Sequence, residues 1–319
     1  MYRISLLDGC LEEGKTAAYA YGVAVLSDIL VVYKKNFESV HDDSLRAITE
    51  VLSNLQDGRN LNFDIKARET VSRGDFISRD LVIVVGGDGT LTSISHNIDS
   101  NTPVMGVNSH PKSDDPNGSV GFYMDSNVET FEHDLLDALE GKAIINQIPR
   151  LQAIIDTTSG NRFTTDPAMN DLLVANTHQY APSKYELRRG DKHCKQQSSG
   201  VVFSTWLGQG AWLNQILDKN HIDDMRKTID VEQVSTHYFV VAREISHEQR
   251  KTQPWAWYDW TNESTVILSD MHRGYVVPDG WDEVHFNRGA TITVNLDAPK
   301  LYLLTFRESI SDRLNNLKN

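Results

Sequence analysis

Cysteine and long apolar runs are both scarce in this sequence. Only Cys10 and Cys194 occur among 319 residues, which is too few for a disulfide scaffold or a four-cysteine zinc site. No apolar run approaches the ~18 residues that a membrane-spanning helix requires. Asp8, Glu12 and Glu13 lie near the start, where a signal or transit peptide would be basic or poor in acids. We therefore expect a cytoplasmic protein without a membrane partner.

Positive charge is also limited. The chain has 31 Lys and Arg against 44 Asp and Glu, a formal net charge of −13. Non-specific nucleic-acid binding needs a basic face that displaces phosphate counterions, so we expect no nucleic-acid partner. Hydrophobic residues make up 39% of the chain, which supports a packed core. At ~150 residues per domain, the length predicts two domains.

The first half of the chain alternates strand-like and helix-like segments. Residues 81–85 are the strongest strand signal, because they are apolar throughout, as in a strand covered on both faces. Further strands are predicted at 29–33, 61–65 and 103–107, and helices around 45–55, 90–97 and 128–139. This alternation predicts an α/β domain over residues 1–142, in which a parallel sheet carries helices on both faces.

After about residue 143, short apolar runs alternate with turn residues, and one helix-like stretch at 212–217 interrupts them. The predicted strands are 151–156, 172–175, 201–205, 238–242, 266–269, 275–277 and 291–295. The pattern predicts a mainly antiparallel β domain over residues 143–296. In the tail, residues 297–319, Ile310, Leu314 and Leu317 share one face of a predicted helix. We expect this tail to pack back on the protein.

The motif that most suggests chemistry is Gly86-Gly87-Asp88-Gly89-Thr90, between the 81–85 strand and the next predicted helix. Three glycines in four residues let the backbone approach a ligand closely. The helix N-terminus offers N–H groups and a partial positive charge that suit phosphate, and Thr90 can cap that helix. Asp88 would repel a phosphate, so its presence suggests a second role, such as accepting a proton from a substrate hydroxyl. The alternative is an ordinary strand–turn–helix corner.

A second phosphate-binding pattern, G-x-x-x-x-G-K-T, occupies residues 9–16. Glu12 and Glu13 would place two carboxylates inside that phosphate cradle, where like charges repel. We interpret the match as chance, and a P-loop nucleotide hydrolase is the minor alternative. The His-Glu pair at 247–248 and the His-Cys pair at 193–194 lack the partners of a metal site, so no metal site is predicted.

The sequence resembles a known superfamily. GGDGT after an apolar strand is similar to NAD kinases, diacylglycerol kinases and sphingosine kinases, and the later motifs resemble the NAD kinases in particular. These motifs are Gly106-Val-Asn108 with Gly118-Ser-Val-Gly121-Phe122, Met169-Asn170-Asp171-Leu172, the segment 198–212 with Ala211-Trp212, and the segment 277–289. The insert at 109–117 resembles the mitochondrial-type NAD kinases and their bacterial relatives. The combination is much more specific than GGDGT alone.

The resemblance implies a fold and an activity. The fold would be an N-terminal Rossmann-like α/β domain, a C-terminal β-sandwich domain and a C-terminal tail that returns to the first domain. The activity would be ATP-dependent phosphorylation of the adenosine 2′-hydroxyl of NAD, which gives NADP. ATP with Mg²⁺ or another divalent metal would be the donor, with the metal held by the phosphates. A homodimer or higher homo-oligomer is also implied.

The resemblance also implies roles for individual residues. Asp88 would be the catalytic residue, as general base or hydroxyl orienter. The substrate- and nucleotide-binding residues would be Gly87, Gly89 and Thr90 around phosphates, Asn170 and Asp171 on ribose hydroxyls, and Asn108, Phe122, Ala211 and Trp212 along the dinucleotide. Lys34 and Lys35 are candidate phosphate contacts or, equally, a solvated surface pair.

Two departures and two alternatives accompany this interpretation. Asp171 stands where the family usually has Glu, and Ser199 stands where Asp is common. A lipid kinase of the same superfamily is one alternative, which the charge of −13 and the Asn170-Asp171 element disfavour. A non-catalytic dinucleotide sensor is the other, and Asp88 argues against it because simple binding gains little from a carboxylate beside phosphates.

Overall fold

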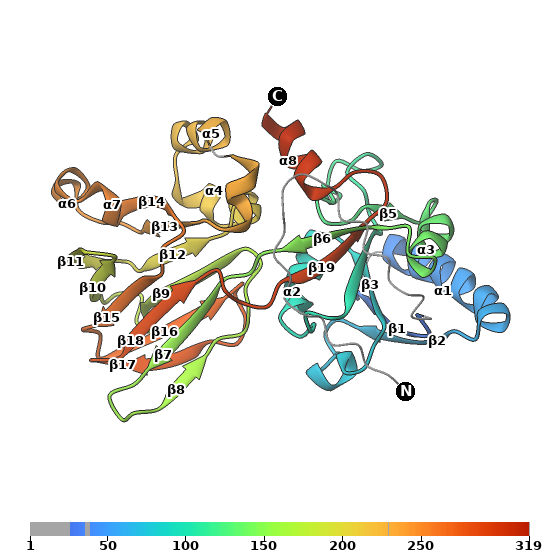
Figure 1. Cartoon of the computed structure of the whole chain (residues 1–319), viewed down its shortest axis with the longest axis horizontal. Helices are drawn as coiled ribbons and strands as arrows, with labels where there is room; N and C mark the ends of the chain where they lie inside the picture. The colour runs from blue at the N-terminus through green and yellow to red at the C-terminus, as the bar shows by residue number, and fades with distance from the viewer. Residues whose placement is uncertain (1–25, 36–38, 229, 319) are drawn as a thin grey trace, which may run out of the picture.

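The computed structural model describes residues 26–35, 39–228 and 230–318, which form two lobes side by side (Figure 1). The first lobe is built on a seven-stranded sheet of order β2-β1-β3-β4-β19-β6, with β5 paired to β4. Its strands are β1 (Asp28–Tyr33), β2 (Asn62–Ala67), β3 (Leu81–Gly86), β4 (Pro103–Asn108), β5 (Ser126–Asn127), β6 (Ile144–Ile148) and β19 (Leu301–Thr305). All neighbours pair in parallel except β6, which runs antiparallel to β19.

Helices cover both faces of this sheet. They are α1 (Ser39–Arg59), α2 (Asp88–Ser95), α3 (Phe131–Leu139) and α8 (Ile310–Lys318), with a 3₁₀ turn η1 (Arg73–Phe76). Successive residues of β1 enter different cores: Ile29 packs in the cluster with α1 and α3, whereas Leu30 packs in the cluster with α2 and α8. The uniformly apolar strand at 81–85 is explained in the same way, since β3 is buried from end to end.

The second lobe is a sandwich of two antiparallel six-stranded sheets, of orders β11-β10-β15-β18-β7-β8 and β14-β13-β12-β9-β16-β17. The first consists of β7 (Gln152–Asp156), β8 (Arg162–Thr164), β10 (Ser183–Arg189), β11 (Lys192–Ser198), β15 (Thr265–Ser269) and β18 (Thr291–Asn295). The second consists of β9 (Asp171–Asn176), β12 (Val201–Ser204), β13 (Tyr238–Ala242), β14 (Tyr258–Thr261), β16 (Arg273–Pro278) and β17 (Val284–Asn287). Residues of both sheets share one core, for example Ile155 and Ile292 with Val174 and Phe203.

Short helices accompany the second sheet. They are η2 (Leu207–Gly210), α4 (Leu213–Ile216), α5 (Lys219–Thr228), η3 (Val231–Ser235), α6 (His247–Thr252) and α7 (Pro254–Trp257). Trp206 and Leu213 pack in the same core as Leu30 and Val32 of the first lobe, so apolar contacts join the two lobes. None of the helices within the described ranges has the length and apolar character of a membrane-spanning segment.

The predicted fold class is confirmed, including the return of the tail. Ile310 and Leu314 are buried, with exposed fractions of 6% and 3%; the side chain of Leu317 is outside the described set. The tail is also more than a packing segment, because β19 lies within the first sheet, between β4 and β6.

The division expected after residue 142 disagrees with the sheet pairing. It assigned residues 144–148 to the second domain, but these residues form β6 of the first sheet. The difference has a physical cause: Leu303 of β19 pairs with Asn146, 157 residues away, so no local pattern indicates the pairing.

Candidate functional site

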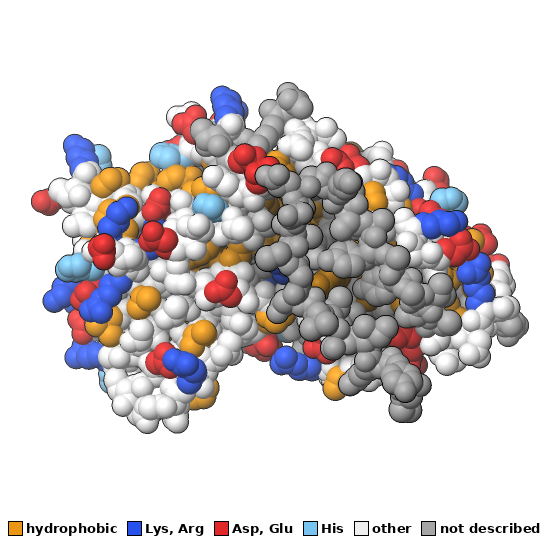
Figure 2. Space-filling model, viewed as in Figure 1, with side chains coloured by type: hydrophobic (Ala, Val, Ile, Leu, Met, Phe, Trp, Pro, Cys, Tyr) orange, Lys and Arg blue, Asp and Glu red, His pale blue; other side chains and the backbone are white. Residues whose placement is uncertain are grey.

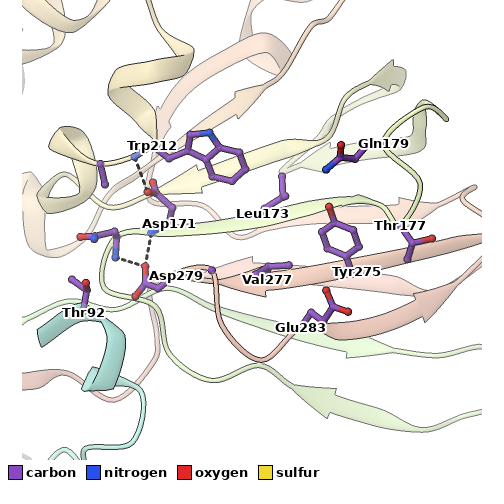
Figure 3. A pocket seen from close by; sticks show the side chains of 13 residues that line it. Thr92, Asp171, Leu173, Thr177, Gln179, Trp212, Tyr275, Val277, Asp279 and Glu283 are labelled. Carbon is purple, nitrogen blue, oxygen red and sulfur yellow. Dashed lines mark hydrogen bonds between the residues drawn. The ribbon is translucent and has the colours of Figure 1, made fainter. Parts of the chain in front are cut away.

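A cavity of about 610 Å³ opens on the second sheet of the sandwich, beside α2 of the first lobe (Figure 3). Its floor comes from β9 and β16, and its side comes from the connection between η2 and α4. The lining residues are Thr92, Asn170, Asp171, Leu173, Thr177, Gln179, Ala211, Trp212, Tyr275, Val277, Asp279, Gly280 and Glu283. The cavity therefore has a polar end near α2 and an apolar length along the strands.

Asp279 shapes the polar end. Its carboxylate accepts hydrogen bonds from the backbone N–H groups of Met169 (2.6 Å), Asn170 (2.9 Å) and Asp171 (2.9 Å). These bonds fix the backbone at the start of β9, where the side chains of Asn170 and Asp171 line the cavity. Asp279 itself adopts a left-handed backbone conformation, with φ of 46°, which Asp tolerates better than most residues. Burial raises the pKa of the Asp279 carboxyl to about 6.

Asp171 presents a carboxylate oxygen to the cavity. The side chain is buried, with 7% of the residue exposed, and Oδ2 accepts a hydrogen bond from the backbone N–H of Trp212 at 3.3 Å. Oδ1 has no hydrogen-bond partner among the described residues. Burial, reinforced by the charge of Asp279, raises the pKa of Asp171 to about 7. A buried acceptor without a partner costs about 1–3 kcal/mol, a cost that a ligand hydroxyl donating to Oδ1 would remove.

The remaining length of the cavity is apolar and flat. Leu173 and Val277 project from neighbouring strands, and the rings of Trp212 and Tyr275 border the same space (Figure 3). Thr177, Gln179 and Glu283 lie toward the end away from Thr92 (Figure 3). Such a slot, with hydrogen-bonding groups at both ends and apolar side chains between them, suits a heteroaromatic base joined to a sugar.

The glycine-rich turn lies at the carboxyl edge of β3, and its glycines have different roles. A Cβ on Gly86 would lie 2.3 Å from Thr90 Oγ1, and one on Gly87 would lie 2.8 Å from Ser119. Both therefore make room for the protein's own side chains. A Cβ on Gly89 would meet nothing within 4 Å, so Gly89 alone faces open space.

Thr90 does not cap α2, contrary to the sequence prediction. The helix begins at Asp88 with Gly87 as its N-cap, and the N–H of Thr90 donates to the carbonyl of Gly87 at 2.8 Å. The side chain of Thr90 is buried, with 2% of the residue exposed, beneath Gly86. Thr90 thus supports the turn from inside, three residues after the N-cap.

Asp88 is bonded to a neighbouring loop. Its Oδ2 accepts from the backbone N–H groups of Gly121 (3.1 Å) and Phe122 (3.0 Å), and its Oδ1 accepts from that of Tyr123 (2.8 Å). Asn108, at the end of β4, donates to the carbonyl of Ser119 in the same loop at 3.3 Å. The hydroxyl of Ser119 also donates to Oδ2, at 3.4 Å. Because each carboxylate oxygen offers about two acceptor positions, Oδ2 is fully engaged and only Oδ1, with its single N–H donor, has capacity for a further one.

The structure thus collects the residues singled out from the sequence into two adjoining groups. Four of them line the cavity: Asn170, Asp171, Ala211 and Trp212. The others lie at the carboxyl edge of the first sheet: Gly87, Asp88, Gly89, Thr90, Asn108 and Phe122. Thr92, on the first turns of α2, lines the same cavity as the first group and so joins the two.

Several features fall outside these groups. Lys34 and Lys35 follow β1, where the N–H of Lys34 donates to the carbonyl of Val85 at 3.0 Å, and Lys35 is exposed. The P-loop-like pattern at 9–16 lies outside the described residues. The sequence predicts no role for Asp279, although Asp279 lies in the segment 277–289 that resembles the NAD kinases.

Comparisons with known proteins agree with this geometry. Residues 32–143 match the family model of the ATP-NAD kinase N-terminal domain. An NAD kinase of Nitrosospira multiformis is 30% identical over 174 residues, which cover 52% of this chain and 54% of that protein. Residues 32–143 therefore form an N-terminal domain of the ATP-NAD kinase family. The chain's match spans about half the length of the first curated relatives.

Solved structures of an NAD kinase and an NADH kinase share the fold. The NAD kinase from Archaeoglobus fulgidus, determined in complex with ATP, superposes with a TM-score of 0.63 at 17% identity, covering 91% of this chain and 98% of that one. Yeast NADH kinase, determined with NADH, superposes with a TM-score of 0.66 at 14% identity, covering 91% and 86%. The superpositions extend over both lobes, so the relationship in fold reaches beyond the segment that the family model matches.

Proposed function

We propose that this protein transfers the γ-phosphoryl group of ATP to the adenosine 2′-hydroxyl of NAD and so forms NADP. One observation carries the proposal: Asp171, whose buried Oδ1 has no hydrogen-bond partner among the described residues, lines a cavity that the helix following GGDGT also lines. A sugar hydroxyl held by Asp171 would lie beside the turn that suits a nucleotide phosphate. The relatives named NAD kinase and the ATP and NADH complexes of the two structural neighbours support the same assignment.

The chain's own residues supply binding and orientation. Asn170 and Asp171 hold the ribose hydroxyls, as amide and carboxylate partners of complementary kind. The aromatic and aliphatic wall of the cavity holds the base. The open space at Gly89, at the N-terminus of α2, receives phosphate oxygens, where backbone N–H groups and the helix dipole favour negative charge.

Phosphoryl transfer needs alignment of the acceptor hydroxyl and stabilisation of charge more than covalent chemistry from the protein. Asp88 would orient the hydroxyl or take its proton, through the acceptor position that remains on its Oδ1. Mg²⁺ or another divalent ion would neutralise charge on the phosphates. Among the described residues no group of three His, Cys, Asp or Glu side chains is arranged to hold a metal, so the phosphates of ATP would carry it.

The proposal includes a cytoplasmic location and assembly as a homodimer or higher homo-oligomer. The resemblance to the NAD kinases supports both, and the acidic composition supports the absence of a nucleic-acid partner. Size-exclusion chromatography with light scattering measures the assembly directly: a mass of 36.0 kDa would be a monomer, and a multiple of it would be an oligomer.

A single assay separates the proposed function from its alternatives. The purified chain is incubated with ATP and Mg²⁺ and with NAD, NADH or diacylglycerol as acceptor. NADP from NAD supports the proposal. Binding of NAD without turnover would indicate a sensor, and phosphorylation of the lipid alone would indicate a lipid kinase.

A further inference from the structure

Trp212 is the largest side chain on the cavity wall, and its ring is supported from outside the cavity. The guanidinium carbon of Arg243 lies over the Trp212 ring, 5.0 Å from its centroid. This separation is within the ~6 Å range of a cation–π contact. Arg243 follows β13 and is not among the residues that line the cavity.

The backbone around Arg243 is well fixed. Its N–H donates to the carbonyl of Gly200 at 2.8 Å, and its carbonyl accepts from the N–H of Ser199 at 2.9 Å. The neighbouring carboxylate of Glu244 accepts a hydrogen bond from the Ser199 hydroxyl. The guanidinium therefore projects from a rigid strand end, and the carboxylate next to it in sequence is engaged elsewhere.

The backbone of Trp212 is bonded on both sides, so the orientation of its ring depends on packing. Trp212 lies between the 3₁₀ turn η2 and the four-residue helix α4; its N–H donates to Asp171 Oδ2 at 3.3 Å, and its carbonyl accepts from the N–H of Gln215 at 2.8 Å. Leu173, Ala175 and Val202 pack below the indole. Loss of the Arg243 contact would remove packing from one face of this ring.

We propose that Arg243 is a positioning residue for the dinucleotide: it holds the Trp212 indole as a flat wall on which the base stacks. This inference rests on the proposed function and adds the residue that sets the geometry of the base slot. Arg243 acts through the ring of Trp212 and does not touch the reacting atoms. Its removal should weaken dinucleotide binding while the rate of the bound complex and the use of ATP remain unchanged.

A double-mutant cycle tests the inference, with the Kd for NAD measured by calorimetry and kcat measured separately. We expect Arg243→Met to raise the Kd about two- to fivefold, the range of a partly exposed cation–π contact. Arg243→Lys, which keeps the cation, should lose less. In a Trp212→Ala background, Arg243→Met should add no further loss, because coupled residues are not additive.

A matched control is available on the same lobe. Arg250 lies over the ring of Trp257, 4.7 Å from its centroid, on α6 and α7 away from the cavity. Arg250→Met removes an equivalent contact and should leave the Kd for NAD and kcat unchanged. A loss of equal size in the Arg250 variant would show that Arg243→Met acts through general stability and would overturn the inference.

Two other outcomes would also overturn the inference. An equal Kd increase from Arg243→Met in both Trp212 backgrounds would mean that Arg243 contacts the dinucleotide itself. A loss in kcat or in the use of ATP would place Arg243 elsewhere in the site. A wild-type chain that binds NAD without forming NADP would overturn the proposed reaction, while the double-mutant cycle would still measure how the Arg243–Trp212 contact contributes to NAD binding. Failure of Arg243→Met to change the Kd would overturn the proposed role of Arg243 and leave the proposed reaction unaffected.

Discussion

Replacement of Asp171 by Asn should stabilise the folded protein and weaken its binding of NAD. The carboxyl has a pKa of about 7 in the folded chain against an ordinary value of 3.8. Between these values the folded state binds more protons than the unfolded state, so stability falls as the pH rises. The loss is about 1.4 kcal/mol per pH unit and on the order of 4 kcal/mol above pH 7. Asn has nearly the same shape and no charge, so it avoids this cost.

The expected signature is the pH dependence of the difference in stability. Urea denaturation of wild type and Asp171→Asn should show the variant more stable at pH 8, with the difference reduced by about 2 kcal/mol at pH 5.5. Asp191→Asn, in the exposed turn between β10 and β11, is the control and should show no such trend. A difference that is the same at both pH values, or a variant less stable at pH 8, would refute the reasoning.

The same substitution should weaken dinucleotide binding. If a ribose hydroxyl donates to the partnerless Oδ1, loss of the charged acceptor costs about 1–3 kcal/mol, or roughly tenfold to a hundredfold in the Kd for NAD. In the wild type, protonation of Asp171 should weaken binding about tenfold between pH 8 and pH 6, because most of the carboxyl is then neutral. Calorimetry across this range should show the dependence in the wild type, and its persistence in Asp171→Asn would assign it to another group.

Four further substitutions test the rest of the site. Asp88→Asn should lower kcat ~10²-fold or more if Asp88 is the base; since it also holds three loop amides, near-normal turnover would leave it only the role of fixing the loop. Gly89→Ala should leave the melting temperature unchanged, because its Cβ meets nothing within 4 Å, but raise the KM for ATP; an unchanged KM would mean that no phosphate approaches there. Asn170→Ala should weaken NAD roughly tenfold to a hundredfold and spare ATP; a loss confined to ATP would contradict its assignment to ribose. Lys15→Ala should leave activity nearly unchanged, and a severe loss in the folded variant would revive the P-loop interpretation.

Local pattern was enough for much of the fold. The uniformly apolar run at 81–85 predicted a strand covered on both faces, and β3 is such a strand. The alternation of elements before residue 143 and the short strands after it predicted the two lobes. These features depend on burial of adjacent residues, which the order of apolar and polar residues records directly.

Features that depend on distant partners were not predictable in this way. β6 joins the first sheet through its pairing with β19. The position of the Asp279 carboxylate depends on backbone N–H groups that lie 108 to 110 residues earlier in the chain. The sequence singles out Asp88 because a carboxylate is unusual in a phosphate-binding turn. The three backbone N–H groups that donate to this carboxylate belong to residues 33 to 35 positions later in the chain. A side chain that accepts a hydrogen bond from a backbone N–H does not depend on the type of residue that donates it. The sequence therefore contains no sign of such bonds, and only the structure reveals them.

Formation of NADP is the measurement that tests the central claim most directly. The purified chain is incubated with NAD, Mg²⁺ and ATP labelled at the γ-phosphate, and the product is separated and tested with a dehydrogenase that accepts NADP but not NAD. We predict a labelled product that this dehydrogenase reduces, which places the phosphate on the adenosine 2′-oxygen. Binding of NAD and ATP with no labelled dinucleotide, or a label on another position of NAD, would contradict the account.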